Sequence, residues 1–526
     1  MHPALVAEAG GWEVAMAVRQ KTRANGDAIR FVLDGEIRTV EGVSPTRSVL
    51  NFLREDLGRT GTKEGCAEGD CGACTVVLAE LAGNDVRFRA VNSCIQFVPT
   101  LDGKELITVE SLKGSDGALH PVQRAMVDCH GSQCGFCTPG FVMSLFALYK
   151  TRQDPTRGEI ADALAGNLCR CTGYRPIVDA GRRMYEYSTE SNDRHQHWMN
   201  CSFSSAGDRE ITQSEREMVE RLRAIRRTTT LVVRHGAATF YAPVTLKALA
   251  DLKAEHPDAR LLAGGTDVGL WVTKQHKDLP TVIYVGDVAE LKSIHVTEDG
   301  IDIGAGASLT DAYEALVGVY PELGELYRRF ASPPIRNAGT LGGNIANGSP
   351  IGDSMPALMV LGTMLTLRKG MSTREMPLDE FYVAYQKTAL QPGEFVERVR
   401  VPRREVTWQL RTYKISKRLD QDISAVCAAF CITLERGRVA QARIAFGGMA
   451  ATPKRATAAE RALIGREWSE ASVRAAISAL DQDFSPITDM RASAAYRRSV
   501  AHNLLYKCYL ETSGQRKPTQ VVEFAI

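Results

Sequence analysis

Hydrophobic and polar positions alternate with a period of two in the first part of the chain, from residue 28 to about residue 110. The alternation runs through the stretches AIRFVLDGEIRTV, CTVVLAEL, VRFRAVNSC and LITVESL. This period predicts half-buried strands, and a short helix is expected between them, from Ser48 to Glu55. Short strands around one helix are typical of a β-grasp domain.

The next part, from residue 119 to about residue 187, has hydrophobic positions at helical spacing only. The apolar run from Phe141 to Leu148 predicts one helix, and Ile160, Leu164 and Leu168 predict another. We therefore expect a small helical bundle here.

A polar segment without periodicity follows and is expected to be a linker. Beyond it, strand and helix patterns alternate in two further units, so that the whole chain is predicted to be an α+β multidomain protein. The predicted limits are 1–26 for an N-terminal extension, 27–112 for the β-grasp domain, 113–188 for the helical domain, 189–235 for the linker, 236–405 and 406–516 for two α+β domains, and 517–526 for a tail.

Composition narrows the class of protein. The formal net charge of +2 argues against a nucleic-acid surface, and the basic stretch from Arg221 to Arg227 is expected to be a solvated helix face. No apolar run reaches the roughly eighteen residues of a membrane span, and the first residues lack the pattern of a secretory signal. Thirteen cysteines without such a signal indicate metal ligation in a reducing, cytoplasmic compartment.

Four of these cysteines, Cys66, Cys71, Cys74 and Cys94, are called the first quartet here. Their spacing is C-x4-C-x2-C with a remote fourth cysteine, which is the ligand pattern of plant-type [2Fe-2S] clusters. Interleaved glycines let such a loop wrap around a cluster and direct amides at its sulfurs. The alternatives are a zinc site or a disulfide knot, but structural zinc usually takes two C-x2-4-C pairs.

The second quartet consists of Cys134 and Cys137, spaced C-x2-C, and of Cys169 and Cys171, spaced C-x-C. This spacing alone is compatible with zinc as well as with iron and sulfur. Each pair adjoins a predicted helix, so the bundle would bring the four thiolates together around one cluster.

Two glycine-rich segments occur in the third domain. In the first, Gly264 and Gly265 follow a predicted strand and expose amides that could bind a pyrophosphate. The segment does not match G-x-G-x-x-G, which argues against a Rossmann domain. In the second segment, Gly342 would leave room for a cofactor, and Thr340 and Asn344 offer hydrogen bonds. The Asp353 carboxylate could accept a hydrogen bond from a ribose or an adenine.

The order of C-x4-C-x2-C, GSQCGFCTPG and GNLCRCTGY resembles the iron-sulfur part of the molybdenum hydroxylase family, and most closely the small subunit of bacterial xanthine dehydrogenases. Both glycine segments resemble the FAD-binding domain of the same family. The resemblance implies a 2Fe-2S ferredoxin-like domain, a helical 2Fe-2S-binding domain, a PCMH-type FAD-binding domain of the vanillyl-alcohol-oxidase fold, and a C-terminal domain like that of carbon monoxide dehydrogenase flavoproteins.

The resemblance also assigns individual residues. The pyrophosphate loop, the second loop and further flavin contacts would be formed by Leu261, Leu262, Ala263, Gly264, Gly265, Thr266, Asp267, Val268, Phe330, Thr340, Gly342, Gly343, Asn344, Asp353, Val396 and Lys414. Without the resemblance, Phe330 would be read as core and Lys414 as a surface charge. Gln133 would contact the molybdopterin of a partner subunit; a helix-terminal amide that caps backbone groups is the alternative.

The function implied is electron transfer within an NAD-dependent xanthine dehydrogenase. A molybdopterin-binding large subunit would oxidise hypoxanthine and xanthine to urate, and electrons would pass to the second-quartet cluster, the first-quartet cluster, FAD and NAD+. A heterotetramer of two small and two large subunits is implied, and no catalytic residue of the hydroxylation is expected in this chain. The alternatives are another molybdenum hydroxylase, acting on an aldehyde, a nicotinate-like ring or carbon monoxide, or a standalone electron-transfer module.

Overall fold

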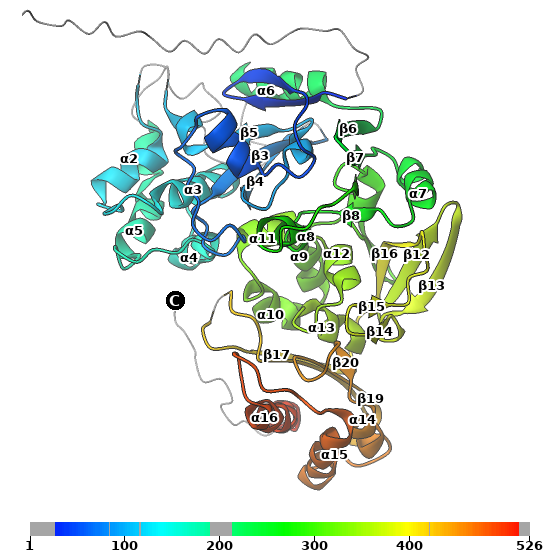
Figure 1. The fold of residues 1–526 in the computed structure, drawn as a ribbon. Helices are drawn as coiled ribbons and strands as arrows, with labels where there is room; N and C mark the ends of the chain where they lie inside the picture. Colours follow the sequence, from blue (N-terminus) through cyan, green and yellow to red (C-terminus); the bar gives the residue numbers. More distant parts are fainter. Residues whose placement is uncertain (1–26, 84, 115–116, 190–212, 420, 515–526) are drawn as a thin grey trace, which may run out of the picture.

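The computed structural model describes residues 27–83, 85–114, 117–189, 213–419 and 421–514. The predicted N-terminal extension, residues 190–212 of the predicted linker and the predicted tail lie outside these ranges. Figure 1 shows the two N-terminal units at one end, the third unit in the middle and the C-terminal sheet at the opposite end. Among the helices of these ranges, none combines the length and hydropathy that a membrane span requires.

The expected β-grasp unit is a five-stranded sheet in the order β2-β1-β5-β3-β4. Strands β1 and β5 are parallel, and the other neighbours are antiparallel. The bounds are Ile29–Leu33 (β1), Glu36–Val40 (β2), Thr75–Ala82 (β3), Asp85–Asn92 (β4) and Glu105–Ile107 (β5). Helix α1 (Val49–Asn51) begins after Ser48, whose hydroxyl accepts from the Asn51 amide at 3.1 Å, and it continues into a π-helical turn, Phe52–Asp56.

The helical unit contains α2 (Pro121–Asp128), α3 (Thr138–Thr151), α4 (Arg157–Leu164) and α5 (Arg175–Arg183). Helix α3 packs against β3 and β4, so the first two units share one hydrophobic core. The prediction that Leu168 belongs to the same helix as Ile160 and Leu164 was wrong. Helix α4 ends at Leu164, because Gly166 turns the chain with a φ of +100°, and Leu168 is 40% exposed.

The interpretation of residues 213–235 as linker was also wrong. This segment forms α6 (Gln213–Ile225) and β6 (Leu231–His235). Met218, Leu222 and Ile225 of α6 are buried in the core of the first two units, and their i, i+4, i+7 spacing is that of an amphipathic helix. Nor is the basic stretch wholly solvated, because Arg227 Nε donates to Asp102 Oδ2 at 2.7 Å and both side chains are buried.

The third unit has two sheets. The first, in the order β6-β7-β9-β8, is followed on the chain by the second, in the order β10-β11-β16-β12-β13. The strands are β7 (Ala238–Ala242), β8 (Arg260–Leu262), β9 (Thr281–Tyr284), β10 (Ile294–Val296), β11 (Gly300–Gly304), β12 (Met364–Lys369), β13 (Ser372–Pro377) and β16 (Phe395–Pro402), with the hairpin β14 (Tyr382–Ala384) and β15 (Lys387–Thr388). The helices are α7 (Leu246–Glu255), α8 (Val268–Thr273), α9 (Leu309–Val319), α10 (Gly324–Arg328), α11 (Pro333–Ala338), α12 (Leu341–Asn347) and α13 (Ser354–Val360).

The C-terminal unit is an antiparallel sheet, β17-β18-β19-β20, covered on one face by helices. Its elements are β17 (Trp408–Ile415), β18 (Val426–Glu435), β19 (Arg438–Gly447), β20 (Lys454–Arg455), α14 (Thr457–Leu463), α15 (Glu470–Asp483) and α16 (Ala494–Thr512). Strand β18 is buried on both faces, between these helices and α13, which is why its sequence is an unbroken hydrophobic run.

Candidate functional site

The cysteines of the first quartet lie in two pairs. Cys66 and Cys71 belong to the loop before β3, Cys74 directly precedes β3, and Cys94 follows β4. Because β3 and β4 pair as an antiparallel hairpin, the end of β4 returns to the beginning of β3. The Sγ atoms of Cys74 and Cys94 are therefore 3.3 Å apart, although the two residues are distant in the sequence.

Backbone amides of the same loop point at the sulfur of Cys66. The N–H groups of Glu68, Asp70 and Cys71 donate to Cys66 Sγ at 3.4, 3.3 and 3.3 Å. The Cys71 thiol and these amides together lower the pKa of Cys66, which favours the thiolate form that a metal ligand takes. Gly69, with a φ of +80°, lets the loop turn back on itself.

The second quartet lies on the surface of the helical unit. Cys137 is the N-cap of α3, and Cys169 and Cys171 lie between α4 and α5. The thiols of Cys134 and Cys171 interact with each other electrostatically, and so do those of Cys137 and Cys169. Cys134 and Cys171 are exposed, whereas the other pair is partly buried. Gln133 precedes Cys134 and is exposed as well.

Both quartets fit a two-iron cluster better than a zinc ion. A structural zinc ion needs four ligands that converge on one point, whereas two irons can each take one pair of thiolates. The cysteines of each quartet lie in two pairs, as two irons require. The amides directed at Cys66 fit the same cluster, because N–H groups offset its negative charge.

The loops of the two quartets are in direct contact. The N–H of Leu168, which precedes Cys169, donates to the carbonyl oxygen of Cys71 at 3.0 Å. The loops approach so closely that a Cβ on Gly72 would lie 2.2 Å from the carbonyl oxygen of Gly166. Glycine at position 72 is thus a condition for bringing the two quartets together.

Asn167 is the polar side chain at this junction, and it is 3% exposed. Its amide nitrogen donates to the Gly72 carbonyl at 3.1 Å and lies 3.3 Å from Thr75 Oγ1. Its amide oxygen accepts from the Ser144 hydroxyl at 2.6 Å. The Asn167 side chain therefore fastens the second-quartet loop both to the first-quartet loop and to α3.

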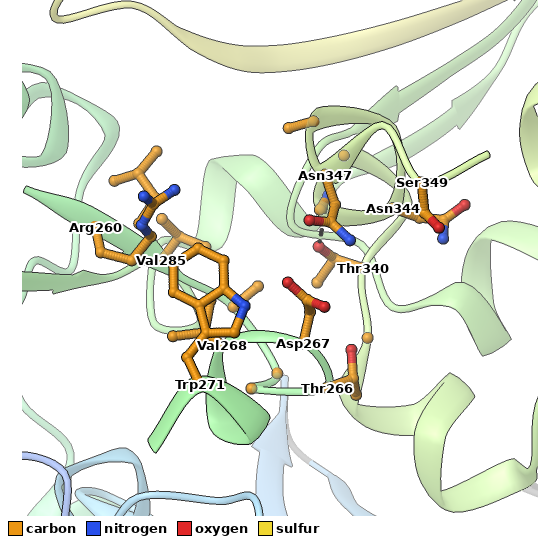
Figure 2. Close-up of a pocket in the computed structure, with 18 of the residues that line it drawn as sticks. Arg260, Thr266, Asp267, Val268, Trp271, Val285, Thr340, Asn344, Asn347 and Ser349 are labelled. Carbon is orange, nitrogen blue, oxygen red and sulfur yellow. Dashed lines mark hydrogen bonds between the residues drawn. The ribbon is translucent and has the colours of Figure 1, made fainter. Parts of the chain in front are cut away.

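A cavity of ≈ 1360 Å³ lies where the β8–α8 loop, the α11–α12 turn and β16 meet. It exceeds the roughly 300–1,000 Å³ of common small-molecule pockets, as an extended dinucleotide such as FAD requires. Figure 2 shows Thr266, Asp267 and Trp271 on one side and Thr340, Asn344 and Asn347 on the other. The buried Oδ1 of Asn344 has no hydrogen-bond partner among the described residues, so a ligand that donates a hydrogen bond fits there.

Nearly all the residues that the sequence assigned to FAD line this cavity. They are Leu261, Ala263, Gly264, Gly265, Thr266, Asp267, Val268, Phe330, Thr340, Gly342, Gly343, Asn344, Asp353, Val396 and Lys414. Leu262 is the exception, since the alternation of β8 turns its side chain into the hydrophobic core, where it is 1% exposed.

The glycines of the two loops make room for neighbouring backbone more than for a ligand. A Cβ on Gly264 would lie 1.8 Å from the carbonyl oxygen of Ala338, and one on Gly342 would lie 2.3 Å from the Cβ of Ala305. The expectation that Gly342 leaves space for the cofactor is corrected accordingly. These glycines let the two loops pack against each other and so shape the cavity wall.

Lys414 and Asp353 form a buried ion pair at the cavity wall. The Lys414 ammonium donates to Asp353 Oδ2 at 2.5 Å and to the Ser424 hydroxyl at 2.8 Å. Ser424 in turn donates to the Asp353 carboxylate. An ammonium carries three donors, so a third N–H of Lys414 remains for a cavity ligand. Lys414 is therefore not a surface charge, and it is the Asp353 carboxylate that neutralises it.

Sequence reasoning missed several cavity residues, above all Trp271 and Arg260. The guanidinium of Arg260 lies 4.5 Å above the Trp271 ring centroid, in a cation–π contact that Figure 2 displays. Trp271 follows Asp267 by four residues on α8, so helical spacing from the glycine loop was a usable signal. Arg260 starts β8, and no feature of the sequence marked it.

The cavity reaches the loop of the first quartet, because Glu68, Gly69 and Asp70 form part of its wall. Gln96, two residues beyond Cys94, donates from Nε2 to the Gly264 carbonyl at 2.6 Å. One hydrogen bond thus joins the first-quartet unit to the predicted pyrophosphate loop.

Four family models match the chain in succession. They describe a 2Fe-2S iron-sulfur cluster binding domain at residues 31–98, a [2Fe-2S] binding domain at 108–182, an FAD binding domain in molybdopterin dehydrogenase at 235–404, and a CO dehydrogenase flavoprotein C-terminal domain at 411–512. The matches confirm the predicted fold class and cofactors. The chain therefore carries two [2Fe-2S] domains and an FAD-binding domain.

The chain is similar to several known proteins. A xanthine dehydrogenase of Emericella nidulans is 32% identical over 96% of this chain and 40% of its own length. Aldehyde oxidase 2 of Macaca fascicularis is 30% identical over 94% of this chain and 40% of its own length. The solved carbon monoxide dehydrogenase from Hydrogenophaga pseudoflava is 27% identical, covering 51% of this chain and 93% of that one with a TM-score of 0.48. The chain thus spans about 40% of the curated relatives it matches, and it belongs to the molybdenum hydroxylase family as a counterpart of the iron-sulfur and flavin part of xanthine dehydrogenase.

Proposed function

We propose that this chain is the iron-sulfur and flavin subunit of a xanthine dehydrogenase. Electrons would leave the molybdenum cofactor of a partner subunit, enter the second-quartet cluster, pass to the first-quartet cluster and FAD, and reduce NAD+. The bound clusters supply one-electron steps, and the flavin converts them into hydride transfer.

The spatial order of the three sites carries this proposal. Cys134 and Cys171 of the second quartet are exposed at the surface. The hydrogen bond from Leu168 to Cys71 joins the second-quartet loop to the first-quartet loop, and the first-quartet loop forms part of the cavity wall. The second quartet, the first quartet and the cavity are therefore in successive contact, starting from the protein surface.

A partner subunit is supported by the surface around the second quartet. Phe136, Leu168 and Tyr174 are 49%, 40% and 41% exposed and flank the exposed cysteines in the sequence. Exposed large hydrophobic side chains close to an exposed site are typical of a protein interface. Gln133 is exposed and directly precedes Cys134, so it would contact the molybdopterin of the partner. We propose one partner subunit per chain, in a cytoplasmic assembly of two small and two large subunits.

A substrate other than xanthine is the second candidate. The aldehyde oxidase relative is nearly as similar as the xanthine dehydrogenase relative, and the partner subunit would hold the substrate site. A panel of xanthine, hypoxanthine, an aldehyde and a nicotinate-like ring, tested on the assembled complex, separates these two possibilities.

The proposal is tested by comparing the isolated chain with the complex. The isolated chain should show the absorption of iron-sulfur clusters and flavin, and should transfer electrons from NADH to an artificial acceptor without oxidising xanthine. Co-expression with the molybdenum subunit should restore xanthine-dependent NAD+ reduction. Xanthine oxidation by the isolated chain, or a colourless zinc protein, would contradict the proposal.

A further inference from the structure

Thr172 lies between a candidate cluster ligand and the turn that starts α5. Its Oγ1 is 3.2 Å from Cys169 Sγ and 3.2 Å from the backbone nitrogen of Tyr174. The Tyr174 hydroxyl, in turn, accepts a hydrogen bond from the Cys169 N–H at 3.0 Å. Three residues of the GNLCRCTGY motif thus form a closed set of hydrogen bonds around one sulfur.

The direction of the Thr172 hydroxyl follows from its partners. A metal-bound cysteine is a thiolate and has no proton to give. The Tyr174 N–H can only donate, so it occupies a lone pair of Thr172 Oγ1 and leaves the hydroxyl proton free. Of these two neighbours of Thr172 Oγ1, Cys169 Sγ is the one that can accept this proton.

The backbone at Tyr174 is strained in a way that serves this arrangement. Its φ is +69° and its ψ is −33°, a region that bulky residues rarely adopt. The Arg175 N–H donates to the Gly173 carbonyl at 2.9 Å, which closes a γ-turn of the rare, strained kind. The ring of Tyr174 packs edge-on against Phe141 with centroids 6.2 Å apart. These contacts hold the strained turn and keep the Tyr174 N–H directed at Thr172.

We propose that Thr172, held by Tyr174, is a positioning residue that raises the reduction potential of the second-quartet cluster. This inference rests on the proposed assignment of Cys134, Cys137, Cys169 and Cys171 as ligands of that cluster. An O–H directed at a ligand sulfur stabilises the reduced, more negative cluster more than the oxidised one. The hydrogen bond from Thr172 would therefore make this cluster a better acceptor of electrons from the partner subunit.

The test is a redox titration of the full chain, in which EPR follows the two clusters separately. Thr172→Val and Thr172→Ala remove the hydroxyl and should lower the midpoint potential of the second-quartet cluster only. Thr172→Ser keeps the hydroxyl and should restore the parent value. Thr138→Val is the matched control, because Thr138 follows Cys137 directly but its hydroxyl donates to Ser132 at 2.7 Å, and it should leave both potentials unchanged.

An unchanged midpoint in Thr172→Val or Thr172→Ala, with both cluster signals intact, would overturn the inference. So would the loss of the second signal in both variants while Thr172→Ser keeps it, because the hydroxyl would then serve cluster assembly and not the potential. If the unmodified chain lacks a second cluster signal, the ligand assignment itself is wrong.

Discussion

The backbone N–H of Leu168 lies 3.0 Å from the carbonyl oxygen of Cys71 and donates a hydrogen bond to it. Each of these residues belongs to the loop of a different quartet, and Leu168 is directly followed by Cys169. A short path of covalent bonds and one hydrogen bond therefore connects the two candidate clusters.

Asn167 should be needed for the junction between the quartets. In Asn167→Leu the Ser144 hydroxyl loses its acceptor, and the Gly72 carbonyl loses one donor but still accepts from Thr75, which should together cost about 1–3 kcal/mol of unfolding free energy. The magnetic interaction between the two reduced clusters in EPR should also change. Ser144→Ala removes only one of these hydrogen bonds and should cost less. Equal stability of parent and Asn167→Leu in chemical denaturation would contradict this role.

Gly264→Ala should disrupt the cavity without harming the quartets. The new Cβ would lie 1.8 Å from the Ala338 carbonyl oxygen, so the two glycine-rich loops must separate. We expect the purified variant to lose most of its FAD and to keep its iron content. The matched control is Gly318→Ala on α9, where no atom lies within 4 Å and where alanine should stabilise the helix by about 0.5–1 kcal/mol. Full FAD occupancy in Gly264→Ala would show that FAD binding does not require the close packing of the two glycine-rich loops.

Lys414→Met should weaken flavin binding and destabilise the protein. It leaves the Asp353 carboxylate buried without its cation, which typically costs about 3–5 kcal/mol. The double variant Lys414→Met with Asp353→Asn removes both charges and should recover part of the stability, but not the flavin affinity. Thermal unfolding and FAD titration by fluorescence separate the two effects. If the double variant is no more stable than Lys414→Met, the unpaired Asp353 carboxylate is not the cause of the lost stability.

Glu105 should make stability depend on pH. It is 2% exposed, its Oε2 has no hydrogen-bond partner among the described residues, and burial raises its pKa to about 7, with Asp34 adding to and Arg221 opposing the shift. The folded state holds the proton more tightly than the unfolded state. The stability that protonated Glu105 contributes is therefore fully present below about pH 4.5 and is lost as the pH rises through about 7. The loss in unfolding free energy should be about 3 kcal/mol.

The check is the unfolding free energy of the parent and of Glu105→Gln between pH 5 and pH 8. The variant should be relatively more stable at the upper end, since glutamine carries no charge. Glu36→Gln on β2, whose side chain is 71% exposed, should follow the parent. Parallel curves for the parent and Glu105→Gln would show that Glu105 does not titrate in this range.

Local patterns in the sequence predicted the most regular features well. The eight cysteines, the strand alternation and the two glycine-rich segments are all short-range signals, and the resemblance added Phe330, Val396 and Lys414, all of which lie at the cavity. The roles of the eight cysteines as cluster ligands and of these residues in binding FAD stay predictions, as do the contact of Gln133 with the pterin and the domain limits other than those of the linker.

The features that the sequence did not predict depend on contacts between distant parts of the chain. The direction of Leu262 follows from the register of β8 in its sheet, and the end of α4 before Leu168 follows from the turn at Gly166. Helix α6 is stabilised by a core that belongs to other units. The pairing of Asp353 with Lys414 joins residues 61 positions apart, and no local pattern reports it.

Electrons from the partner subunit are expected to reach the flavin only through the second quartet, and the variant Cys171→Ala in the assembled complex tests this path. Rapid-mixing absorption would follow FAD reduction by xanthine, and EPR would confirm that only the first cluster remains. We predict that xanthine no longer reduces the flavin, while NADH still reduces an artificial acceptor at the parent rate. Flavin reduction by xanthine at an unchanged rate, in a variant without the second cluster signal, would contradict the account.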